Sequence, residues 1–180
     1  MENSSSKQQN LFILNQGAIF GMIQVLFLTI LYFADNLINS SWSDILLIIY
    51  LLYVYFSSRK YRNNYYNGFI SYSKAFSYGF KIMALSGIVV GFFHFVLIKI
   101  DTELANEYVI LAQDMCLQFG IPESQIEAME PVFKAYSNPW THFMGAIFSG
   151  VLWGVIVSLI TSIFVKRKGG DPFQEIMKDV

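Results

Sequence analysis

The feature that most constrains this chain is a set of long apolar stretches that carry almost no charge. Residues 11–34 include no charged side chain, residues 45–56 are all apolar or aromatic, and 82–98 and 140–165 hold one histidine each. Inside a bilayer the chain itself must satisfy every backbone N–H and C=O, and a helix needs about 20 mostly apolar residues to cross the hydrocarbon core. The sequence therefore predicts an all-α, polytopic membrane protein with four transmembrane helices, at approximately 12–35, 40–58, 78–98 and 140–165.

The composition agrees with lipid as the main solvent. Charged residues are 14% of the 180 residues, against about 25% in an ordinary soluble domain. The formal net charge of -1 provides no basic excess for neutralising phosphates, so we expect no nucleic acid among its partners. The single cysteine, Cys116, excludes an intrachain disulfide and leaves no Cys/His spacing typical of a zinc site.

The lysines and arginines predict the orientation of the spans, because cationic loops stay in the cytoplasm. The polar N-terminus, the connection between the second and third spans and the C-terminal tail together hold ten of the twelve cations. The two exceptions are Lys99 and Lys134, between the third and fourth spans. With an even number of spans, this distribution predicts that both termini are cytoplasmic.

The segment 65–81 has the pattern of an amphipathic helix. Phe69, Tyr72, Phe76 and Phe80 recur at helical spacing, and Lys74 lies on the opposite face. This pattern predicts a helix in the inner membrane interface, with its lysines facing anionic headgroups. The alternative interpretation is that the segment is the start of the third span.

The segment 99–139 is the one sizeable polar region between spans, and it has seven carboxylates and two lysines. Two apolar stripes at helical spacing are separated by Gly120, a helix stop, and Pro122, a first helical residue. The first stripe is Leu104, Tyr108, Leu111, Met115 and Phe119, and the second is Ile126, Met129, Phe133 and Tyr136. We expect an outer hairpin of two short amphipathic helices, which face one another or the membrane. Pro131 predicts a kink in the second.

Three of the predicted spans contain pairs of glycines four residues apart. The pairs are Gly17 with Gly21, Gly87 with Gly91, and Gly150 with Gly154. Small residues at this spacing let helix backbones approach closely in a membrane. We expect these glycines to pack the helices of one chain together, and the alternative is a face for self-association.

The two histidines, His94 and His142, are the candidates for chemistry at membrane depth. Both are predicted near the outer ends of their spans, so neighbouring helices would bring the imidazoles together beneath the hairpin. A pH sensor or a metal site completed by carboxylates of the hairpin would use such a pair. The alternative is two unrelated interfacial histidines.

Catalytic and cofactor-binding motifs are missing from the sequence. It has no P-loop, HExxH, nucleophile elbow or GxGxxG, and no span has a central Asp, Glu or Arg. Glu123, Glu127 and Glu130 share a helix face, which is typical of a solvated acidic surface. We therefore expect no enzyme activity and no cofactor.

The layout resembles a known family. The run Asn67-Gly68-Phe69-Ile70-Ser71-Tyr72 leads into the third span, and Gln125-Ile126-Glu127-Ala128-Met129-Glu130 precedes Ser137-Asn138-Pro139. With these runs, nearly the whole chain is similar to an uncharacterised bacterial membrane family, domain of unknown function four-one-nine-nine. The resemblance implies a four-span protein of the bacterial inner membrane, and it implies no activity and no catalytic residues.

Two functions remain open from the sequence. The first is a non-enzymatic protein of the lipid bilayer whose outer acidic hairpin interacts with or senses something outside, as a homo-oligomer or with a membrane-protein partner. The second is a small transporter or channel subunit with a path lined by Gln24, Ser86, Ser149, Ser158 and the two histidines.

Overall fold

The computed structural model describes residues 2–38 and 43–167, and in this part of the chain the fold is all-α, as predicted. The long helices are α1 (Glu2–Phe33), α2 (Ser43–Tyr65), α3 (Tyr72–Ile100) and α7 (Pro139–Val165). Between α3 and α7 lie α4 (Thr102–Gln118), α5 (Glu123–Ala128), α6 (Glu130–Lys134) and the 3-10 helix η2 (Ala135–Ser137).

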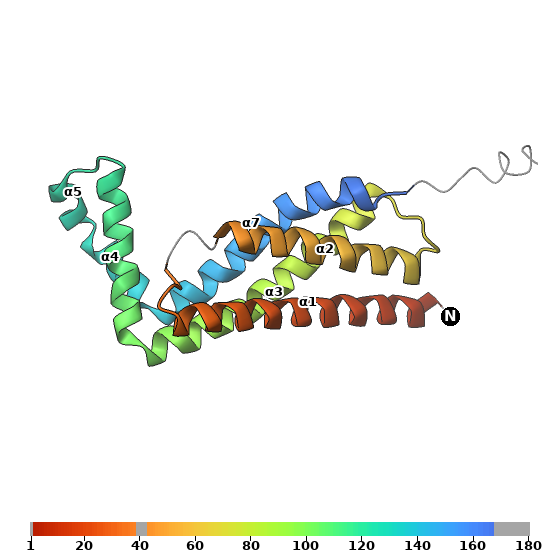
Figure 1. The fold of residues 1–180 in the computed structure, drawn as a ribbon, viewed down its shortest axis with the longest axis horizontal. Coiled ribbons are helices and arrows are strands. Elements are labelled where there is room, and N and C mark those ends of the chain that lie inside the picture. Colours follow the sequence, from red (N-terminus) through yellow and green to blue (C-terminus); the bar gives the residue numbers. More distant parts are fainter. Residues whose placement is uncertain (1, 39–42, 168–180) are drawn as a thin grey trace, which may run out of the picture.

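The four long helices run along the long axis of the molecule in alternating directions (Figure 1). Helix α3 packs against both α7 and α1, while α2 packs against α7 and α3. The start of α1, the α2–α3 connection and the end of α7 lie at one end of the bundle, and α4 and α5 lie at the other (Figure 1). The polar segment between α3 and α7, and the cations of the α2–α3 connection, are therefore at opposite ends.

Three helices of the described chain are long and apolar enough to cross a membrane: α1 over Ser6–Phe33, α3 and α7. These are the helices at the predicted spans 12–35, 78–98 and 140–165. Helix α2 is not among them, since its apolar stretch is followed within the helix by Arg59, Lys60 and Arg62. The predicted span 40–58 begins with residues that lie outside the described part, and the count of four spans stays a prediction.

The structure corrects the expectation of a separate helix over 65–81. Tyr65 is the last residue of α2, and α3 begins at Tyr72 and continues without a break to Ile100. Asn67 and Gly68 lie between these two helices and have φ values of 48° and 85°. This left-handed conformation is incompatible with a continuous right-handed helix. The alternative interpretation, the start of the next long helix, describes residues 72–81.

The segment 99–139 is mostly helical, and its first helix ends just before Gly120, where the sequence predicts a helix stop. Gly120 has a φ of 78° after α4, and Pro122 is the N-cap of α5. The second predicted helix is divided into α5, α6 and η2, because Pro131 is at the start of α6 and cannot continue the hydrogen bonds of α5. Leu104, Ile126 and Phe133 are buried, whereas Met115 and Phe119 of the predicted stripe are exposed.

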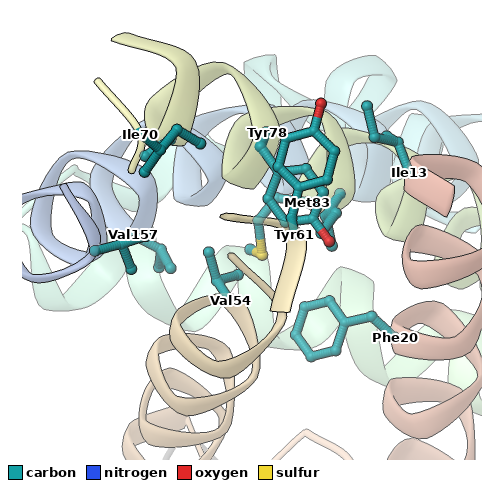
Figure 2. Packing of buried hydrophobic residues seen from close by; sticks show 11 residues of the cluster. Ile13, Phe20, Val54, Tyr61, Ile70, Tyr78, Met83 and Val157 are labelled. Atoms are coloured by element: carbon teal, nitrogen blue, oxygen red, sulfur yellow. The ribbon is translucent and has the colours of Figure 1, made fainter. Parts of the chain in front are cut away.

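The main hydrophobic core contains side chains from all four long helices, which point toward one another (Figure 2). The rings of Tyr61 from α2 and Tyr78 from α3 stack with centroids 4.0 Å apart, and the Tyr78 hydroxyl lies 2.7 Å from Ser57 Oγ. Ile70 of the α2–α3 connection is buried in the same cluster. The core therefore holds this connection against the bundle.

Candidate functional site

The two histidines predicted from the sequence line one pocket. This histidine pocket, of about 550 Å³, lies between α3, α4, the α6–η2 segment and α7. Its lining includes His94 from α3, Tyr108 from α4, Tyr136 from η2 and His142 from α7. The pocket is thus lined on one side by α3 and α7 and on the other by the segment between them.

Each imidazole uses one nitrogen for a hydrogen bond to a backbone carbonyl. His94 Nδ1 donates to Val90 O at 3.0 Å within α3, and His142 Nε2 donates to Tyr136 O at 2.6 Å, which joins α7 to η2. The ring of Tyr108 lies 4.7 Å from that of His142, centroid to centroid. A neutral imidazole that donates from one ring nitrogen can accept a hydrogen bond at the other.

Tyr108 adds a neutral hydroxyl to this pocket. Burial raises the pKa of Tyr108 to about 12, so the phenol keeps its proton at physiological pH. Two imidazoles and a phenol can donate and accept hydrogen bonds. The chemistry of the pocket is therefore that of hydrogen bonding within apolar walls.

The two histidines stand without the carboxylates that a metal site would need. Within residues 2–38 and 43–167, no three His, Cys, Asp or Glu side chains are grouped closely enough to hold a metal ion. Zinc sites in proteins use three or four protein ligands, so the pair His94 and His142 falls short of such a set. Glu123, Glu127 and Glu130, from the acidic face, are exposed on α5 and α6.

A second, smaller pocket lies deeper between the long helices. It has a volume of about 190 Å³ and includes His94, Gln24, Ser86 and Ser149 in its lining. His94 therefore borders both pockets. Ser158, expected on the same path, lies elsewhere: it is fully buried, and a Cβ added to Gly79 would come within 2.7 Å of its hydroxyl.

The six glycines of the predicted pairs lie at contacts between helices of this chain. A Cβ added at Gly17 or Gly21 would lie 2.6 Å or 2.5 Å from the Cβ of Leu85 or Val89, so α1 is pressed onto α3. On the other side of α3, Gly87 and Gly91 face α7, from which Gly150 and Gly154 face back. These glycines set the close α1–α3 and α3–α7 distances that bring His94 and His142 to one pocket.

Asp101, at the start of α4, accepts two hydrogen bonds, and the sequence indicates only one of them. Asp101 caps α4, accepting from Leu104 N–H at 3.0 Å, and also accepts from the Tyr32 hydroxyl at 2.7 Å. These two hydrogen bonds lower the pKa of Asp101 from its ordinary value. An aspartate before an amphipathic segment is a recognisable N-cap. Nothing local indicates its partner Tyr32, which is 69 residues away.

A family model matches most of the chain. The model described as "Protein of unknown function (DUF4199)" matches residues 15–167, which include every residue that lines the two pockets. No curated protein and no solved structure is significantly similar to the chain.

Proposed function

The chain belongs to the DUF4199 family of proteins of unknown function, and from this premise we propose that it is a non-enzymatic protein of the bacterial inner membrane with an interaction or sensing surface outside the cytoplasm. That surface is the segment made of α4, α5, α6 and η2, residues 102–137, called here the α4–η2 unit. It corresponds to the acidic hairpin expected from the sequence.

The proposal includes four spans with both termini in the cytoplasm. It is supported by the alternating directions of α1, α2, α3 and α7, with α2 as the fourth span (Figure 1). Arg59, Lys60 and Lys74 belong to the end opposite the α4–η2 unit, as the positive-inside rule requires. This arrangement gives the unit access to the periplasm.

The native cysteine offers a direct test of this orientation. Cys116 lies in α4 and is partly exposed. A membrane-impermeant maleimide added to intact cells with a permeabilised outer membrane should label it. In a matched variant, C116S with Ser73→Cys at the exposed start of α3, labelling should require lysis of the inner membrane. The reverse pattern would contradict the orientation.

The observation that carries the proposed sensing role is the position of the histidine pocket. It lies where the α4–η2 unit meets the membrane helices, and His142 contributes the hydrogen bond to Tyr136 O that joins the two. A group that entered the pocket would touch both parts at once. A ligand that bound one position of the unit on the helices better than another would shift the unit toward that position, which is what a sensor needs.

An in-cell photocrosslinking experiment tests the interaction surface. A photoreactive residue is placed at Ile110 or Leu117, exposed on α4, and in control variants at Phe92 or Phe148, exposed on the long helices α3 and α7. The proposal expects discrete, saturable protein adducts from the α4 positions and lipid adducts from the controls. Lipid adducts alone from all four positions would show that the unit lies on the bilayer and would overturn the partner-binding role.

The deeper pocket favours a second candidate function, a small transporter or channel subunit. Gln24, Ser86 and Ser149 line it together with His94, which also borders the histidine pocket. A polar solute could pass along such a row of groups. Proteoliposome flux through the wild-type chain that is lost in S86V, with S162V as a control outside the pocket, would support this function. Flux at the background level would count against it.

A further inference from the structure

A separate pocket lies at the opposite end of the bundle from the histidines. It has a volume of about 500 Å³ and is formed by the α2–α3 connection, the first turn of α3 and the two residues after α7. We call it the basic pocket, because Lys74, Lys166 and Arg167 line it. These cations served above as a signal of orientation, and no ligand has been assigned to the pocket that they line.

The backbone around the basic pocket is held by specific hydrogen bonds. Ile70 and Arg167 exchange a pair of them, from Ile70 N to Arg167 O at 3.1 Å and from Arg167 N to Ile70 O at 3.0 Å. Buried Arg62 of α2 donates from Nη1 to Val165 O at 2.9 Å, and this hydrogen bond holds the last residue of α7. The cations are thus carried on a defined scaffold.

The charge of the basic pocket is uncompensated among the residues that line it. Eight residues form the lining, and no Asp or Glu is among them. In the described part of the chain, the one ion pair is Lys134 with Glu130, on α6. Burial is the largest cause that lowers the pKa of Arg62, and the positive charges of Arg167 and Arg59 lower it further.

The start of α3 adds to the positive potential. Ser71 is its N-cap and satisfies Lys74 N–H, whereas the first turn contains no acidic residue. The first N–H groups of a helix lack intrahelical partners, and the helix dipole makes this end favourable for an anion and unfavourable for lysine. Lys74 beside this terminus is therefore stabilised once an anion is present.

We propose that the basic pocket binds a phosphate group, held by Lys74, Lys166 and Arg167 at the start of α3. Arg and Lys are the side chains that bind phosphate oxygens, and helix N-termini do so with their N–H groups. Phe69, half-exposed at the rim, and Tyr66, whose ring lies 4.7 Å from Lys74 Nζ, give the pocket an apolar edge. The phosphate is that of an anionic lipid headgroup or of a soluble phosphate ester, which share this chemistry.

Native mass spectrometry of the full chain in detergent tests the proposal with three probes. They are phosphatidylglycerol, zwitterionic phosphatidylcholine and the soluble ester glycerol 3-phosphate. The pocket variant is K74Q/K166Q/R167Q. The matched control, R59Q/K60Q/K81Q, removes the same number of lysines and arginines from exposed positions outside the pocket. Circular dichroism shows whether each variant keeps its helices.

Each cation near an anionic headgroup contributes about fivefold in affinity, so we expect the pocket variant to bind about 100-fold more weakly than wild type. The control variant should stay within about threefold of wild type. Binding of phosphatidylglycerol over phosphatidylcholine identifies the lipid source, and binding of glycerol 3-phosphate alone identifies the soluble source. Equal loss in the pocket and control variants, or no binding of any probe by wild type, would overturn the proposal.

Discussion

Gly87 of α3 and Gly150 of α7 lie backbone to backbone: a Cβ added to Gly150 would be 3.0 Å from the Cα of Gly87. The same Cβ would lie 3.0 Å from Met83 O, so both neighbours are backbone atoms of α3, which cannot turn away as a side chain can. This crossing fixes the distance between α3, which carries His94, and α7, which carries His142.

Replacing Gly150 with Ala should therefore destabilise the bundle by about 1–3 kcal/mol, the usual cost of overpacking. The measurement is the midpoint of thermal unfolding in detergent. Gly145→Ala is the control on the same helix, since a Cβ there meets nothing within 4 Å. It should leave the midpoint unchanged or raise it, because alanine favours helix over glycine. Equal effects of both substitutions would contradict the close contact.

Asp101→Asn should lower the unfolding midpoint by a few degrees at neutral pH. The substitution weakens the cap of α4 and the hydrogen bond from Tyr32. In the folded chain both hydrogen bonds lower the pKa of the Asp101 carboxyl group. Stability from a carboxylate with a lowered pKa is fully present above its unfolded pKa of about 3.9 and is lost as the pH falls through the folded value. The difference between wild type and D101N should therefore narrow below about pH 4. Asp114→Asn, an exposed change in α4, is the control and should show no such difference.

Arg62→Gln should destabilise the chain by about 2 kcal/mol, because it removes a charged hydrogen bond to a buried carbonyl, that of Val165. Thermal unfolding measures the loss, and hydrogen exchange should show faster opening of the Ile70–Arg167 bridge. Arg59→Gln, in the preceding turn and exposed, should change neither. A bridge that exchanges as slowly in R62Q as in wild type would show that Arg62 does not hold the end of α7.

His142→Ala should loosen the α4–η2 unit, whereas His94→Ala should not. His142 donates across elements to Tyr136 O, while His94 donates to Val90 within its own helix. Hydrogen exchange of residues 130–138 is the measurement, and it should be faster only in H142A. If the two variants exchange alike, the bond from His142 does not secure η2.

The small-residue pairs and the helix stop at Gly120 could be predicted because their signals are local. A glycine every fourth residue defines a helix face, and glycine followed by proline ends a helix. Which face packs on which is a matter of three-dimensional fit. Gly17 and Gly21 lie on Leu85 and Val89 and not on another glycine pair, and no period in the sequence specifies that choice.

The α2–α3 connection shows how a periodic pattern can mislead. The aromatic spacing after Tyr65 favoured a helix, but the turn-forming dipeptide Asn67-Gly68 within it determines the backbone. The basic pocket was missed for a related reason. In the sequence its lysines and arginine indicate only which side of the membrane they occupy. The hydrogen-bonded pairing of Ile70 with Arg167 is what brings Lys74 and Lys166 to the same pocket.

Helix α3 extends from one end of the bundle to the other without a break. It runs unbroken for 29 residues, about 43 Å at 1.5 Å per residue, with Lys74 near its first turn and His94 near its last. It also packs against α1, α2, α4 and α7. Lys74 lines the basic pocket and His94 lines both the histidine pocket and the deeper one, so a single unbroken helix contributes to the walls of all three.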